Sequence, residues 1–91
     1  MARSPQSSDE TPSQIFKSSE RFQAGARALG RRVRQLRHER GLSLYQASAA
    51  MDLELSHLQR IEAGTLNPTL STLMRVADGL GVKVMELVSE V

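Results

Sequence analysis

The stretch SLYQASAAMDLELSHLQRIEAG, residues 43–64, decides the fold of this chain. Ser43 is a residue type that favours the N-cap position, so it predicts a short helix over about residues 44–51. Asp52 follows, and aspartate is among the non-glycine residues that best tolerate a positive φ. The first half of the stretch therefore predicts a short helix that ends in a tight turn.

The second half of the stretch predicts another helix, over about residues 55–63. Leu58 and Ile61 share its inner face, and Gly64 follows it at the position where a helix commonly ends. Ser48 is small enough to let the first helix pack closely against this one. The whole layout is a helix-turn-helix, in which the first helix braces a second helix whose outer side chains can enter the major groove of DNA.

The flanking sequence predicts further helices and no strands. A long helix is expected over about residues 20–40, and shorter ones over about 70–80 and 83–88. Apolar residues of the long helix recur at steps of four and three, which places on one face Phe22, Ala26, Leu29, Val33 and Leu36. The predicted fold is therefore all-α with five helices, in a single domain over residues 19–91.

The N-terminal segment, residues 1–18, is rich in Ser, Pro, Gln and Thr. After Met1 its only bulky apolar residues are Ile15 and Phe16, too few to offset the entropy of ordering the chain. We therefore expect a flexible N-terminal tail, from which Ile15 and Phe16 can dock on the domain or on a partner.

Composition excludes several functional classes. The 91 residues contain no cysteine, and the two histidines have no matched ligand spacing, so neither a metal site nor a cofactor is expected. No catalytic constellation is present, so the protein is not expected to be an enzyme. No apolar run approaches the length of a membrane span or a secretory signal. We expect a cytoplasmic, nucleoid-associated protein without contact to a membrane.

The formal net charge of +2 conceals a strong asymmetry. Residues 21–40 contain seven arginines and one acidic residue, whereas residues 41–91 are net acidic. Within the long helix, Arg27, Arg31, Arg34 and His38 fall opposite the apolar face. This row is either a solvated helix face or a track for DNA phosphates, and charge alone does not decide between them.

Beyond its layout, the chain resembles the phage-repressor-like, or Cro/xenobiotic-response-element, helix-turn-helix family over about residues 26–88. The matching motifs are LRHERGLS at 36–43, LxRIEAG at 58–64, NPTLxTL at 67–73 and LGV at 80–82. They occur in the order and with the spacing of the family. The resemblance implies a five-helix domain that binds double-stranded DNA, commonly as a homodimer on a two-fold-related operator.

The resemblance also implies which residues face DNA. Base contacts in the family correspond to Leu44, Leu55, Ser56, Gln59 and Arg60. Phosphate contacts correspond to Tyr45, Glu54, His57, Thr65, Leu66 and Asn67. Arg37 and Glu62 correspond to an internal ion pair that joins the long helix to the second helix of the motif.

Several of these positions depart from the family pattern. Leu44 replaces a glutamine, Glu54 replaces a neutral cap, and Thr65-Leu66 replaces a pair that is often basic. Arg60 is the one clear base-reading cation, since its guanidinium suits bidentate contact with guanine. The leucines can instead touch thymine methyl groups.

Two functions remain open at this stage. The first is a DNA-binding transcriptional regulator that acts as a homodimer. Its dimer contact is expected to involve Val84, Leu87, Val88 and Val91, with Phe16 or Phe22 as further candidates. The second is a protein-interaction module, such as the antitoxin of a toxin–antitoxin pair, in which the N-terminal tail binds a protein partner and DNA binding is secondary.

Overall fold

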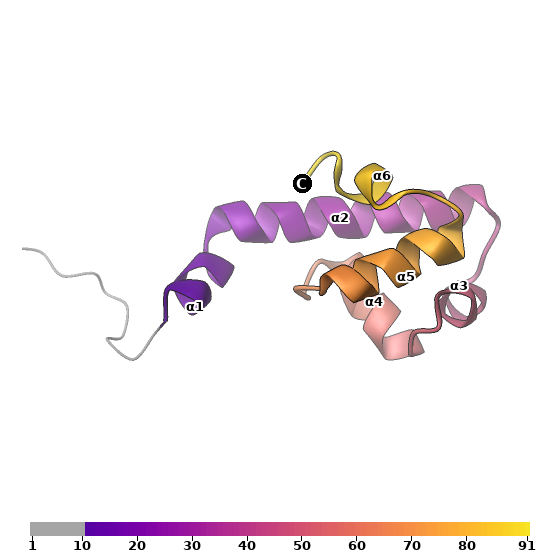
Figure 1. The fold of residues 1–91 in the computed structure, drawn as a ribbon, viewed down its shortest axis with the longest axis horizontal. Coiled ribbons are helices and arrows are strands. Elements are labelled where there is room, and N and C mark those ends of the chain that lie inside the picture. The colour runs from indigo at the N-terminus through magenta and orange to yellow at the C-terminus, as the bar shows by residue number, and fades with distance from the viewer. Residues whose placement is uncertain (1–10) are drawn as a thin grey trace, which may run out of the picture.

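A computed structural model of the chain describes residues 11–91, and this part contains six helices and no strands (Figure 1). The helices are α1 (Pro12–Lys17), α2 (Glu20–Glu39), α3 (Leu44–Met51), α4 (Leu55–Ala63), α5 (Leu70–Leu80) and α6 (Val84–Val88). The all-α class is confirmed. Helices α2 to α6 lie within a residue of their predicted bounds. Serine or threonine side chains accept the capping hydrogen bonds at the starts of α2, α3 and α5.

The core forms where α2 to α6 meet. Its members are buried and apolar: Leu29, Val33, Leu36, Ala47, Met51, Leu58, Ile61, Val76, Ala77, Leu80 and Leu87. Aliphatic side chains, alanine and methionine fill this space, as the low aromatic content of the chain requires.

Helix α2 crosses α4 at very short range, and Gly30 makes this possible. A Cβ atom on Gly30 would lie 2.5 Å from the carbonyl oxygen of Glu62 and 2.6 Å from that of Ile61. No larger residue fits without moving one of the two backbones. The close approach fixes the long helix directly against the second helix of the helix-turn-helix.

Helix α1 was not predicted. Thr11 and Gln14 form a reciprocal capping box at its start, and Pro12 occupies its first turn. The Phe16 ring meets the Phe22 ring edge to face, with centroids 6.0 Å apart. These local contacts give residues 12–17 a helical form, whereas the flexibility expected of residues 1–18 stays a prediction. Residues 1–10 of that tail lie outside the described residues.

The C-terminal helix α6 packs on α2 and α5, which corrects part of the expected dimer contact. Leu87 is 1% exposed and belongs to the core, so it is not available to a second subunit. Val84 and Val88 are half buried against the same core. Val91 is 63% exposed, and Met85 of α6 is 69% exposed. Among the described helices, none is long and apolar enough to cross a membrane.

Candidate nucleic-acid interface

The corner between α3 and α4 is built by residues that the sequence singled out. Asp52 ends α3 in the left-handed region, with φ 54° and ψ 47°. The amide of Leu53 donates to the carbonyl oxygen of Ser48 at 2.9 Å, which closes the turn. Ser48 is 4% exposed, and its hydroxyl donates to the Tyr45 carbonyl at 2.8 Å. The predicted turn and the small packing residue are therefore both present.

Helix α4 buries one face and exposes the other. Leu58 and Ile61 point into the core, with exposed fractions of 0% and 2%. The exposed face carries Ser56, Gln59 and Arg60, and all three stand free of the core. A helix anchored on one side with polar donors and acceptors on the other has the form needed to read base edges in a groove.

The remaining positions that the resemblance assigned to DNA vary in exposure. Tyr45 is 72% exposed on α3, and Leu55 is 39% exposed at the start of α4. Glu54 is exposed, caps α4 without a side-chain hydrogen bond, and brings a negative charge to this edge. His57 is half buried.

Arg37 and Glu62 form the ion pair that the resemblance implied. Nε of Arg37 donates to one carboxylate oxygen of Glu62 at 2.7 Å, and Nη2 donates to the other at 2.9 Å. Nη1 of Arg37 donates to the Leu42 carbonyl at 3.0 Å. The hydrogen bond to Glu62 raises the pKa of Arg37 above its ordinary value, although burial acts in the opposite direction. The three hydrogen bonds of Arg37 therefore tie α2 and the α2–α3 loop to α4.

Leu44 is less exposed than the resemblance implied. It is half buried and packs against the core. With Gln59 it lines a shallow recess of about 270 Å³ over the Arg37–Glu62 pair. Leu44 therefore borders the same recess as the ion pair, and its apolar side chain needs no hydrogen-bond partner there. Contact between Leu44 and DNA stays a prediction.

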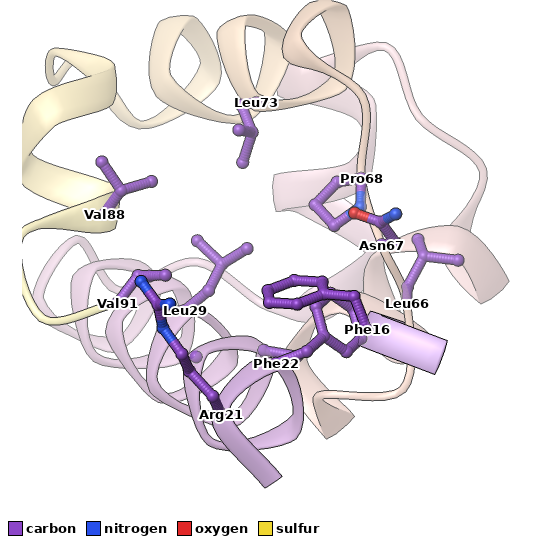
Figure 2. Close-up of a pocket in the computed structure, with 12 residues that line it drawn as sticks. Phe16, Arg21, Phe22, Leu29, Leu66, Asn67, Pro68, Leu73, Val88 and Val91 are labelled. Carbon is purple, nitrogen blue, oxygen red and sulfur yellow. The ribbon is translucent and has the colours of Figure 1, made fainter. Parts of the chain in front are cut away.

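The residues of the loop after α4 also differ in how far they are exposed. Thr65 and Asn67 are exposed, whereas Leu66 is half buried and packs against the core. Leu66 and Asn67 also line an apolar pocket of about 270 Å³, in which Phe16 and Phe22 lie close together (Figure 2). Only part of the Leu66 side chain is therefore available for contact with DNA.

Sequence reasoning missed one neighbour of the α4 surface. Arg34 of α2 lines the same recess as Gln59 and Ala63 of α4, so its side chain borders the exposed face of α4. The spacing within α2 showed that Arg34 is exposed, but only the crossing of α2 and α4 shows what it lies beside.

The sequence model of a family described as a helix-turn-helix domain matches residues 28–89. The chain belongs to this helix-turn-helix family.

Relatives of the chain include the immunity repressor protein of Bacillus phage phi105, 40% identical over 62 residues that make up 68% of this chain and 43% of the relative. The HTH-type transcriptional regulator DdrOP3 of Deinococcus deserti is 38% identical over 66% of this chain and 46% of its own length. The chain thus spans less than half the length of these two relatives. Their names describe regulators and not enzymes, as the residues led us to expect.

A solved helix-turn-helix structure confirms the fold. The restriction-modification controller protein C.AhdI of Aeromonas hydrophila superposes with a TM-score of 0.69 at 30% identity, over 70% of this chain and 97% of the controller. Within residues 11–91 of the present helix-turn-helix protein, no group of three or more His, Cys, Asp or Glu side chains comes together as a metal site.

Proposed function

We propose that the protein is a sequence-specific DNA-binding transcriptional regulator that acts as a homodimer on a two-fold-related operator. The observation that carries this proposal is the exposed face of α4. Gln59 and Arg60 project from a short helix whose other face is buried and whose position is held by the Arg37–Glu62 pair. Rigid placement is what base readout requires, because each bidentate contact depends on geometry.

The site residues divide into two groups in this proposal. Base edges are read by Ser56, Gln59 and Arg60, with Leu55 and the exposed part of Leu44 against thymine methyl groups. Phosphates are contacted by Tyr45, His57, Thr65 and Asn67 and by the remaining part of Leu66, while Glu54 limits how closely a phosphate approaches α4.

The experiment is a selection of binding sites from randomised duplexes. The wild-type protein should enrich a motif with two-fold symmetry, and its half-sites should lie about one helical turn, roughly 34 Å, apart. Arg60→Ala should relax preference at one base pair of each half-site and weaken the best site by about 1–3 kcal/mol. Arg21→Ala, an exposed arginine on α2, is the matched control and should leave the motif unchanged. Recovery of no motif from the wild-type protein would overturn the proposal.

The homodimer is supported by apolar side chains left exposed in the C-terminal part of the chain. Leu70 and Met74 of α5 are 66% and 51% exposed, in addition to Met85 and Val91. Light scattering at micromolar concentration should give a dimer, which Met85→Glu should weaken and the control Gln35→Glu on α2 should not. A strict monomer with and without DNA would contradict this part of the proposal.

One observation favours the second candidate, a protein-interaction module. Ile15 and Phe16 on α1 remain 37% and 50% exposed, so α1 offers an apolar edge to a protein partner. A chain that begins at Ser19, without α1, should then keep its DNA motif and lose the partner. If the wild-type protein enriches no motif but binds the product of a neighbouring gene through α1, this candidate replaces the first.

A further inference from the structure

Three arginines form a row along α2 that the proposed function does not yet use. Arg27, Arg31 and Arg34 are spaced by four and three residues, so they share one side of the helix, and all three are exposed. We call them the arginine stripe. Like charges at this spacing destabilise a helix, so the stripe opposes folding unless something else compensates it.

The arginine stripe lies beside α4. A Cβ atom on Gly64, at the C-terminus of α4, would lie 2.9 Å from the Cα atom of Arg27. At the other end of the stripe, Arg34 shares its recess with Gln59. The crossing at Gly30 lies between these two contacts. The stripe therefore runs along the flank of the helix that carries the candidate base-reading residues.

No acidic residue neutralises the stripe within the described part of the chain. Residues 11–91 contain two ion pairs, Arg37–Glu62 and Arg40–Glu39, and neither involves it. Three other arginines are bonded to backbone carbonyl groups: Arg32 to Glu86, Arg40 to Leu80, and Arg75 to Asp52. Within residues 11–91, Arg27, Arg31 and Arg34 have no such partner, and they lie beside α4.

The dimensions of the stripe match a DNA strand. Seven residues of α-helix separate Arg27 from Arg34, a rise of about 10 Å. The phosphates of one B-DNA strand follow each other at about 3.4 Å along the helix axis and at longer steps along the winding strand itself, so a row of this length spans roughly two to three of them. The loop at Thr65-Leu66 holds no basic residue that could supply this charge instead.

We propose that the arginine stripe binds the phosphates of the DNA strand that borders the groove entered by α4. The inference rests on the proposed function, because it places DNA at α4. The arginine stripe then supplies affinity that does not depend on the DNA sequence, while α4 discriminates between bases.

The test compares two triple variants that remove the same charge. Arg27→Gln/Arg31→Gln/Arg34→Gln removes the stripe, and glutamine keeps a good helix former at each position. The control is Arg21→Gln/Arg32→Gln/Lys83→Gln. Arg32 is bonded to α6, Lys83 caps α6, and Arg21 precedes Arg32 by about three helical turns. In Figure 1, α6 lies on the opposite side of α2 from α4. Circular dichroism establishes that both variants are folded.

Dissociation constants are measured between about 50 and 200 mM salt, on the selected operator and on a scrambled duplex of equal length. Loss of three phosphate contacts should flatten the slope of log K against log salt by about 2.7 on both duplexes. The affinity lost relative to wild type should then be about 40-fold greater at the low-salt end than at the high-salt end. The control should change the slope by less than the loss of one phosphate contact would.

The outcomes separate this inference from the proposed function. If the two triple variants have equal salt slopes while the wild type still prefers its operator, the stripe is a solvated face and the inference is wrong. If the wild type shows no preference but the stripe variant alone flattens the slope, the inference stands and sequence-specific regulation does not. Absence of any DNA binding overturns both.

Discussion

Removal of either partner of the Arg37–Glu62 pair should destabilise the domain far more than removal of an exposed charge on the same helix. The side chains of Arg37 and Glu62 are 8% and 9% exposed and share two hydrogen bonds. Arg37→Ala leaves a buried carboxylate without its partner, which costs about 3–5 kcal/mol. It also leaves the Leu42 carbonyl without the hydrogen bond that Nη1 of Arg37 donates to it. Arg34→Ala, on the exposed side of α2, should cost no more than about 0.5 kcal/mol.

The expected loss is large relative to the whole free energy of unfolding of a domain of this size. Stabilities of about 0.05–0.15 kcal/mol per residue imply roughly 4–12 kcal/mol for the whole domain. Arg37→Ala should therefore move the urea midpoint strongly without changing the m-value, as long as the variant remains folded in water. Circular dichroism in the far ultraviolet reports the transition.

A double-mutant cycle isolates the pair. Arg37→Ala, Glu62→Ala and the double variant should show a coupling of at least about 0.5 kcal/mol, because the double variant leaves neither charge unpaired. Additive losses, or a loss for Arg34→Ala equal to that for Arg37→Ala, would refute the view that this pair holds α2 against α4.

Three further predictions concern packing, the turn and the surface. Gly30→Ala should lower the unfolding free energy by about 1–3 kcal/mol in urea titrations, because its Cβ would meet the Glu62 carbonyl, whereas Gly25→Ala meets only the end of a side chain at 3.0 Å and should be neutral or stabilising. Asp52→Val should cost at least about 1 kcal/mol and Asp52→Gly should not, since residue 52 has φ 54°; equal thermal midpoints would contradict this. Leu44→Gln should change which duplexes are selected and lower stability by about 1 kcal/mol, since Leu44 is half buried; an unchanged motif would show that residue 44 does not face DNA.

Most helix boundaries of this protein could be predicted because they are set by local interactions. Ser43 and Thr69 accept hydrogen bonds from amides three residues later, and Gly64 and Gly81 adopt positive φ at the helix ends. Each of these signals acts within about one helical turn of the chain. The same holds for α1, whose capping box was present in the sequence but was outweighed by the polar composition of its surroundings.

The candidate site was predicted less completely, because exposure depends on what a side chain meets. The resemblance placed Gln59 and Arg60 at exposed positions of α4, and both are exposed. Leu44 and Leu66 were assigned by resemblance to DNA-facing positions, and the structure packs both against the core. Leu87 was assigned to a dimer contact and is buried. A leucine looks the same in sequence whether it covers a core or a surface.

The residues alone determined an all-helical chain, its turn at Asp52 and the concentration of arginine in residues 21–40. Only the tertiary structure decided that Gly30 is a contact point between two helices and not merely a weak position in one. It also decided that the arginine stripe runs beside α4. Periodicity shows which residues share a side of a helix, but the side that faces a neighbour is set by how two backbones dock. That docking depends on residues such as Gly30 and Glu62, which lie far apart in the chain.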